Sequence, residues 1–200
     1  MPIEHEPRHR LAFENRHVRH FDVELEPGYV ALYHWHRNDG VFVNIAPSET
    51  TAQDLGGEPK QRGWRAMGET YFIGYSDKPK AHRVTNSGDR TYHVTDTEIL
   101  ESCESTQSGF APANNQTLIV DNARVFVTRI MLHPGESTEL EGPCGMLVSV
   151  YAGALFLESP GNSALLSLAP AGFHWRESNQ TYRLRNAGKT VFHGVDIRIK

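Results

Sequence analysis

The hydrophobic residues of this chain lie in short runs separated by Pro-Gly or Gly-containing turns. Clear examples cover residues 19–25, 124–132 and 145–158, which are rich in β-branched or aromatic residues. Such runs, bounded by turn residues, are typical of β-strands. Long windows in which apolar residues recur every 3.6 residues are missing, so we expect little helix.

The chain contains an internal repeat. Residues 82–99 (HRVTNSGDRTYHVTDTEI) match residues 182–199 (YRLRNAGKTVFHGVDIRI) at a spacing of 100 residues. A weaker match pairs residues 24–45 with residues 131–152 at a spacing of 107, and it aligns two Pro-Gly pairs. The repeat units are therefore about 80 to 85 residues long, with about seven extra residues in the first unit.

The turns within the repeat predict how its strands connect. The sequences NSGD (86–89) and NAGK (186–189) contain Asn and Gly, which tolerate positive φ and favour tight turns between antiparallel strands. Short strands with regular turn signals indicate a sandwich or a barrel. Two units therefore predict an all-β protein of two tandem barrels.

Composition shifts suggest the domain bounds. We expect an N-terminal arm (1–17), a first barrel (18–100), a polar linker (101–117) and a second barrel (118–200). A loop-like insert at residues 48–64 accounts for the extra length of the first unit.

Composition and charge argue against some classes of binding partner. The chain has 200 residues and a net charge of −4, and it has no stripe of Lys and Arg, so we do not expect nucleic acid as a partner. The apolar runs are shorter than the ~20 residues of a membrane span, so we expect no membrane partner. No apolar stretch of signal-peptide length begins the chain, and we expect a cytoplasmic protein. Cys103 and Cys144 fit neither a zinc spacing nor a disulfide framework, so we expect two reduced thiols.

Two histidines stand one residue apart in GYVALYHWHRNDG (28–40). On a strand, residues i and i+2 point to the same face, so His34 and His36 present two imidazoles that can chelate one ion. His82, on a later predicted strand, would complete a set of three nitrogen donors if the two strands are neighbours. Imidazole suits iron, zinc, copper, nickel and manganese, and three protein ligands leave positions open for a substrate.

These residues resemble the motifs of the cupin superfamily. Gly28, five residues, His34 and His36 match the beginning of its first motif, G-x5-H-x-H. His82 and Asn86 match the H-x3-N of the second motif, and the repeat makes the chain similar to a two-domain bicupin over most of its length. The resemblance implies two jelly-roll barrels and a divalent metal ion, such as Fe(II), Mn, Ni or Zn, on the motif histidines of the first barrel.

The chain also departs from the cupin pattern. The glutamate of the first motif should fall at Gly40 or Val41, neither of which offers a side-chain ligand. Asp39 lies one position early, and strand alternation points it away from the histidines unless a bulge intervenes; we keep it as an additional candidate. Some cupins, such as the thiol dioxygenases, use three histidines without a carboxylate.

The second unit lacks the motif histidines. Glu141 and Pro143 are expected where His34 and His36 stand, and Tyr182 replaces His82, so we expect a degenerate, structural second barrel.

Most other histidines and aromatic residues have simpler roles. Tyr71 and Phe72 are candidates to line the pocket of the first barrel, and Arg65 and Arg83 could neutralise an anionic substrate. We expect solvated histidines in the basic N-terminal arm and structural ones elsewhere; these are His5, His9, His17 and His20, and then His93, His174 and His193.

Two functions stay open at this point, beside a third, a purely structural or regulatory partner-binding protein, for which the sequence offers no positive signal. The first is a metal-dependent enzyme acting on a small polar molecule: a three-histidine dioxygenase if the ion is Fe(II), or a lyase, isomerase or hydrolase with another ion. The second is a bicupin that binds a small molecule without turning it over, with metal absent from the degenerate site. A fold does not fix a reaction. Either protein could be a monomer or a homodimer.

Overall fold

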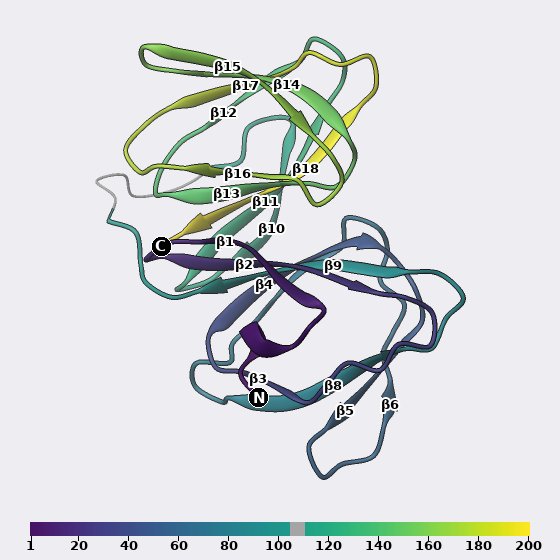
Figure 1. Ribbon diagram of the computed structural model, residues 1–200. Helices are drawn as coiled ribbons and strands as arrows, with labels where there is room; N and C mark the ends of the chain where they lie inside the picture. Colours follow the sequence, from purple (N-terminus) through teal and green to yellow (C-terminus); the bar gives the residue numbers. More distant parts are fainter. Residues whose placement is uncertain (105–110) are drawn as a thin grey trace. The chain divides into compact units, whose positions relative to one another are not determined.

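The computed structural model describes residues 1–104 and 111–200, and over these residues the predicted all-β fold is confirmed. The chain forms two compact units, Met1–Glu101 and Ser102–Lys200, and each contains two antiparallel sheets (Figure 1). One short 3-10 helix, η1 (Ile3–His5), precedes the first strand.

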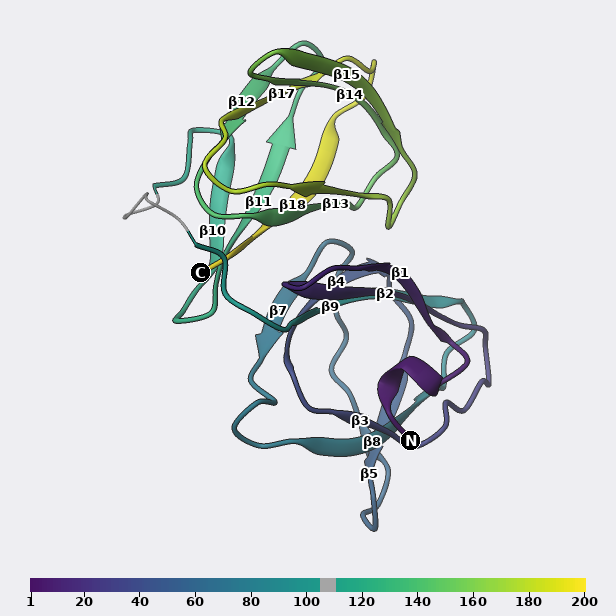
Figure 2. The same ribbon diagram turned by 60° about the vertical axis from the view of Figure 1, so that its left-hand side comes forward.

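The first unit is a jelly roll whose two sheets face each other (Figure 2). In spatial order, its five-stranded sheet contains β1 (His9–Glu14), β2 (Val18–Leu25), β9 (Tyr92–Ile99), β4 (Asp39–Ala46) and β7 (Thr70–Ile73). Its four-stranded sheet contains β3 (His34–His36), β8 (Lys80–Asn86), β5 (Thr50–Asp54) and β6 (Lys60–Gln61).

The second unit repeats this topology strand by strand. Its five-stranded sheet contains β10 (Gln116–Asp121), β11 (Val125–Leu132), β18 (Phe192–Ile199), β13 (Gly145–Ser149) and β16 (Phe173–Arg176). Its four-stranded sheet contains β12 (Ser137–Leu140), β17 (Tyr182–Asn186), β14 (Gly153–Ser159) and β15 (Asn162–Leu168). The sequence repeat is therefore a structural repeat.

Apolar side chains fill the space between the two sheets of each unit. Phe21, Val23 and Leu25 alternate along β2 and join the core of the first unit. The central strand β4 is buried almost throughout, because it has a neighbouring strand on each side and lies under the other sheet. Burial of this apolar area stabilises the fold by roughly 25 cal/mol for each Å² removed from water.

The asparagine shared by the two repeats closes the same turn in each unit. In the first unit, the side-chain amide of Asn86 donates to the carbonyls of Leu25 and Arg90 at 2.8 and 2.7 Å. Asn186 makes the equivalent hydrogen bonds to Leu132 and Thr190 at 2.9 and 2.7 Å. The asparagine of the H-x3-N motif therefore has a structural role in both units.

The expectation of solvated histidines near the N-terminus is wrong for most of them. The segment predicted as an arm contains β1, which pairs with β2 and brings His9 opposite Val23. The His9 side chain is only 9% exposed, and His17 and His20 are buried; His5 is exposed as expected. The many arginines around these residues suggested a solvated segment; most of β1 is exposed, but the His9 side chain points into the unit and is buried.

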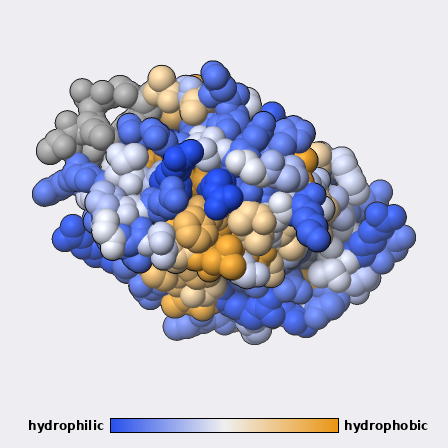
Figure 3. All heavy atoms as spheres, turned by 90° about the horizontal axis from the view of Figure 1, so that it is seen from above, coloured by the Kyte–Doolittle hydropathy of each residue, from blue (hydrophilic) through white to orange (hydrophobic). Residues whose placement is uncertain are grey.

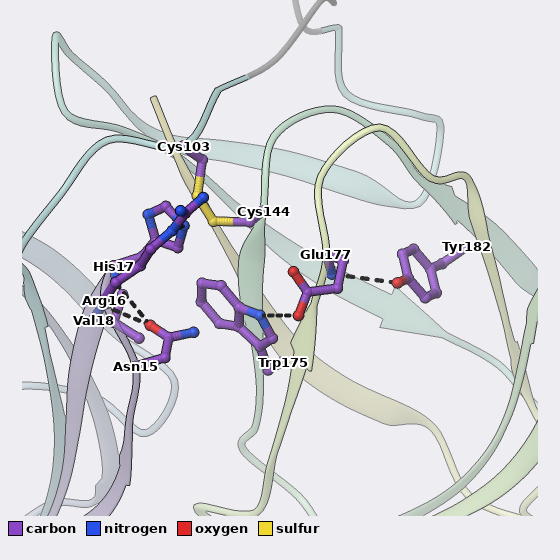
Figure 4. The surroundings of a disulfide bond; sticks show 9 residues. All are labelled: Asn15, Arg16, His17, Val18, Cys103, Cys144, Trp175, Glu177 and Tyr182. Atoms are coloured by element: carbon purple, nitrogen blue, oxygen red, sulfur yellow. Dashed lines mark hydrogen bonds between the residues drawn. A yellow bond between two sulfur atoms is a disulfide. The ribbon is translucent and has the colours of Figure 1, made fainter.

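The expectation of two reduced thiols is also wrong, because the structure joins Cys103 and Cys144 in a disulfide bond within the second unit (Figure 4). Their Cα atoms lie 5.8 Å apart, within the usual range for a disulfide. Cys103 belongs to the segment predicted as a linker, and Cys144 directly precedes β13. The two residues are 41 positions apart, so their spacing alone does not reveal the contact.

The surface is largely polar. Figure 3 shows an apolar patch on one face, surrounded by hydrophilic residues. Leu165, Trp64 and Leu55 are the most exposed large hydrophobic residues, at 65%, 62% and 60%. Among the described residues, no helix has the length and apolar character to cross a membrane.

Candidate metal centre

The three histidines predicted as ligands lie together inside the first unit. Strands β3 and β8 are neighbours, and His34 pairs directly with His82. The ring centroid of His34 lies 5.1 Å from that of His36 and 5.1 Å from that of His82, and the last two rings are 4.9 Å apart. The i, i+2 spacing on β3 therefore directs two imidazoles to one side, and the neighbouring strand supplies the third.

A fourth histidine, His9, joins the cluster from the opposite sheet. Its ring centroid lies 4.4 Å from that of His34 and 6.4 Å from that of His36. One potential ligand atom from each of these three histidines lies within 4.8 Å of the others. The sequence interpretation missed His9 because it treated the segment as a charged arm; the one signal was the apolar Leu11 and Phe13 at alternate positions after it.

Hydrogen bonds fix the orientation of His34. Its Nδ1–H donates to the carbonyl oxygen of Leu32 at 2.8 Å, which leaves Nε2 as the unprotonated nitrogen of the neutral ring. This Nε2 atom is buried and has no hydrogen-bond partner among the described residues. An unpartnered buried acceptor is costly, so a native site of this kind usually receives a ligand or an ion.

A buried carboxylate, Glu6, organises two of the histidines. Its Oε2 lies 2.8 Å from Nδ1 of His9, and its Oε1 accepts a hydrogen bond from the backbone N–H of Leu32 at 3.1 Å. The carbonyl of Leu32 in turn holds His34. Burial alone would raise the pKa of Glu6, but the hydrogen bond and charge of His9 and two backbone N–H groups lower that pKa to about 2. Glu6 is therefore ionised at neutral pH.

His34, His36 and His82 are neutral at physiological pH. Burial lowers the pKa of His34 to about 4 and that of His82 to about 3, and neighbouring positive charges lower both further. Burial also holds the pKa of His36 well below its usual value, with additional effects from His82 and His34. Neutral imidazole is the form that binds metals.

The histidines line a cavity of about 40 Å³, a volume that fits an ion with a few small ligand atoms. Tyr75 stacks on the ring of His36 at a centroid distance of 4.7 Å, and Arg62 donates a hydrogen bond to the hydroxyl of Tyr71 at 3.1 Å. The other lining residues are mostly apolar or aromatic: Val23, Leu25, Phe42, Ile73, Val84, Tyr92 and Val94.

The remaining candidate residues divide between the cavity and other positions. Tyr71 lines the cavity, whereas Phe72, the next residue on β7, does not. Asp39 lies outside the cavity lining, and its Oδ1 accepts hydrogen bonds from the backbone N–H and the hydroxyl of Ser76 at 2.9 and 2.7 Å. Arg65 and Arg83 also lie outside the lining and stack on tyrosine rings.

A different carboxyl group, that of Asp96 on β9, lies beside the histidines. Its Oδ2 is 3.6 Å from Nδ1 of His36, and it lines the cavity. A Cβ atom at position 40, where the cupin motif would place glutamate, would lie 3.0 Å from Oδ1 of Asp96. Gly40 therefore leaves room for the Asp96 carboxyl group. Burial raises the pKa of Asp96 well above its usual value, and the nearby Glu98 raises it further.

The second unit has lost the site, but the sequence alignment of the two units was off by one residue. Leu140 pairs with Tyr182 as His34 pairs with His82, so Leu140, and not Glu141, corresponds to His34. Gly142 then corresponds to His36, and Pro143 does not. Leu140 and Tyr182 belong to the apolar core of this unit. A slip of one residue on a strand exchanges its two faces, which explains why Glu141 is exposed.

The buried aspartate of the repeat has different partners in the two units. Asp196, the counterpart of Asp96, accepts hydrogen bonds from Arg176 and from Arg198, the latter at 2.7 Å. In the first unit these two arginine positions hold Ile73 and Glu98, as the strand registers show. Neither oxygen of Asp96 has a hydrogen-bond partner among the described residues. The aspartate is thus paired in the second unit and faces the histidine cavity in the first.

Comparisons with known proteins establish the fold. A scan against protein-family models finds no match, and the sequence matches no curated protein. Among solved structures, the chain is similar to AerE from Microcystis aeruginosa (TM-score 0.68, 12% identity, 98% of both chains covered). It is also similar to salicylate 1,2-dioxygenase from Pseudoaminobacter salicylatoxidans (TM-score 0.64, 11% identity, 93% of this chain and 69% of that one).

The fold is named in the description of a third similar structure. It is a cupin 2 conserved barrel domain protein from Leptotrichia buccalis (TM-score 0.56, 10% identity, 94% of this chain and 86% of that one). The predicted bicupin architecture is therefore confirmed: the chain has the fold of a two-domain cupin, with both jelly rolls present.

Proposed function

We propose, from this two-domain cupin fold and its buried histidine cluster, that the first unit binds a divalent metal ion and acts as a metal-dependent enzyme on a small polar molecule. The observation that carries the proposal is the buried Nε2 atom of His34, which has no hydrogen-bond partner among the described residues and lies among three other imidazoles.

The donor set fits a first-row transition metal. His9, His34 and His36 would hold the ion, and His82 would be a fourth donor beside them. Nitrogen donors suit Fe(II), Mn, Ni and Zn. The carbonyl and the carboxylate that bind Nδ1 of His34 and of His9 are typical outer partners of metal-binding histidines, because they fix the tautomer and the orientation of the ring.

The chemistry follows from this donor set. When bound, such an ion supplies Lewis-acid activation of a substrate or, as Fe(II), activation of dioxygen. The protein contributes a small cavity with mostly apolar and aromatic walls, and the stacked Tyr75 holds His36 in position. The similarity in fold to a salicylate 1,2-dioxygenase supports a dioxygenase as the first reaction to test.

The second candidate is a bicupin that binds a small molecule without turning it over. The observation that favours it is the size of the cavity, about 40 Å³, which leaves little room for a substrate beside an ion. Release of a chemically unchanged small molecule on denaturation of the purified protein would support this candidate.

Elemental analysis of untagged protein tests the proposal. We expect about one equivalent of transition metal per chain, and a higher melting temperature when Fe(II), Mn, Ni or Zn is added to metal-free protein. His34→Ala should abolish both effects, whereas His174→Ala in the second unit should change neither. A wild-type protein that contains no metal and shows no thermal shift with any of these ions would contradict the proposal.

Two further variants define the ligand set. If His9 is a ligand, His9→Ala should lower the affinity for Zn(II) as strongly as His36→Ala does. His82→Ala should have an equal effect if four histidines bind the ion, and a smaller one if His82 only borders the site.

A further inference from the structure

Among the described residues that line the histidine cavity, Arg62 is the one arginine or lysine. The residue directly follows β6, within the insert at residues 48–64 that lengthens the first unit. The backbone N–H of Arg62 donates to the carbonyl of Thr50 at 2.9 Å, which continues the pairing between β5 and β6. This anchoring directs the side chain to the cavity, where it lies with His36, His82 and Tyr71.

Within residues 1–104 and 111–200, Arg62 has no acidic partner. Its side chain donates a hydrogen bond to the hydroxyl of Tyr71 at 3.1 Å, and no ion pair joins it to a carboxylate of these residues. Three tyrosines, Tyr71, Tyr75 and Tyr92, line the cavity with it. Arg62 is half-buried. A guanidinium group stays protonated in a protein, and partial removal from water favours an opposite charge beside it.

Asp96, the acidic residue among those that line the cavity, does not provide the opposite charge for Arg62. The carboxyl group of Asp96 faces His36, with Oδ2 3.6 Å from Nδ1, and within residues 1–104 and 111–200 it forms no ion pair with Arg62. Within the described residues, the Arg62 guanidinium thus donates to Tyr71, and its other N–H groups are open to a ligand.

The second unit shows what the fold requires at this position. Leu155 pairs with Leu166 and with Asn186, just as Thr50 neighbours Arg62 and pairs with Asn86. Leu166 therefore corresponds to Arg62, and it packs against the apolar core of the second unit. Since the same strand position holds a leucine in the second unit, the fold does not require an arginine there. We therefore assign Arg62 a role in the cavity and not in the stability of the fold.

We infer that the site takes an anionic ligand, and that Arg62 binds a carboxylate group of that ligand beside the histidine cluster. This inference deepens the proposed function, on which it rests for the identity of the site, by naming the substrate class. The planar guanidinium can bind a carboxylate through two parallel hydrogen bonds. Tyr71, Tyr75 and Tyr92 line the same cavity, and a tyrosine hydroxyl can donate a further hydrogen bond to a carboxylate.

The test compares acetate with acetamide, a neutral molecule of nearly the same shape, in NMR titrations of the full chain. We expect wild-type protein to bind acetate at least about tenfold more tightly than acetamide, because charge-assisted hydrogen bonds are the stronger kind. Arg62→Gln should remove this preference, and Arg62→Lys, which keeps the charge but not the planar fork, should retain part of it.

Arg65→Gln is the matched control, because Arg65 stacks on Tyr71 at 3.8 Å but lies outside the cavity lining. It should bind acetate like wild type. Equal binding of acetate and acetamide by wild-type protein would overturn the inference, and so would an unchanged affinity for acetate in Arg62→Gln. If Arg62→Gln does not fold, a preference for acetate in Arg62→Lys as strong as that of wild type would count against the two-bond carboxylate contact.

Each titration is run with metal-free protein and with protein loaded with Zn(II). Arg62→Gln should bind as much zinc as wild type, since Arg62 is not a ligand. Acetate binding that depends on Arg62 in a protein without any affinity for metal would sink the proposed function and leave this inference standing. Zinc binding without any preference for acetate over acetamide would overturn this inference and leave the proposed metal site standing.

Discussion

The carboxylate of Glu6 and the imidazole of His9 lie 2.8 Å apart, between Oε2 and Nδ1, in the first ten residues of the chain. Both side chains are buried, and η1 and the start of β1 position them. The hydrogen bond directs the other ring nitrogen of His9 away from Glu6. An N-terminal segment that packs across the barrel thus completes a site whose other histidines come from β3 and β8.

Glu6→Gln should weaken metal binding without removing a ligand. The glutamine can still accept a hydrogen bond from His9, but it lacks the negative charge that makes the imidazole a better donor to a metal. Loss of such an outer partner typically costs 10–100-fold in affinity. Competition with a coloured zinc chelator measures the effect. Glu4→Gln is the control, since Glu4 is exposed and pairs with Arg19 at 3.4 Å; equal zinc affinities in all three proteins would contradict the role of Glu6.

The two aspartates of the repeat should respond differently to the same substitution. Asp196→Asn leaves Arg176 and Arg198, both buried, without the carboxylate that they share, and we expect a loss of about 3 kcal/mol or more in unfolding free energy. Asp96→Asn removes no hydrogen bond that the described residues make, so we expect a change below about 1 kcal/mol. Urea denaturation at pH 7.5 measures both. Equal losses would show that the repeat uses the two residues alike.

The sequence predicted the fold well and the site only in part. The repeat, the strand-length apolar runs and the H-x-H spacing were sufficient for the bicupin architecture and for the cluster of His34, His36 and His82, because these features are local or lie on neighbouring strands. The sequence did not predict that His9 and Arg62 belong to the site. His9 lies in an arginine-rich segment and Arg62 in an insert, and only the folded chain brings them to the cavity. The disulfide between Cys103 and Cys144 was not predicted either, because folding brings together two residues that lie 41 positions apart.

Stability should fall on acidification through His20, which is fully buried on β2 with its Nδ1 2.8 Å from the hydroxyl of Thr97. Burial lowers the pKa of His20 from 6.5 to about 4. As the pH falls, His20 is therefore protonated in the unfolded chain before it is protonated in the folded one. The stability that neutral His20 contributes is complete above pH 6.5 and is lost as the pH falls toward 4. The full loss is roughly 3 kcal/mol, and about 2 kcal/mol of it should occur between pH 7.5 and pH 5.

The measurement is urea denaturation of wild type and His20→Gln at these two pH values. The wild type should lose about 2 kcal/mol more than the variant, because glutamine can keep a hydrogen bond to Thr97 but does not titrate in this range. His5→Gln, at an exposed position, should behave like wild type. A pH dependence that is the same in all three proteins would exclude His20 as a source of acid sensitivity.

Reduction of the disulfide between Cys103 and Cys144 should destabilise the second unit. The bond closes a loop across 41 positions, and the chain-entropy relation assigns a loop of this length about 4 kcal/mol of stabilisation, within the usual range of 2 to 4 kcal/mol. Cys103→Ser with Cys144→Ser should reproduce the effect of reductant, and reductant should not lower the stability of this double variant further. Alkylation of the protein at the moment of cell lysis, followed by mass spectrometry, reports whether the bond exists in the cell; two alkylated cysteines would mean that the thiols are free there, as in a reducing compartment.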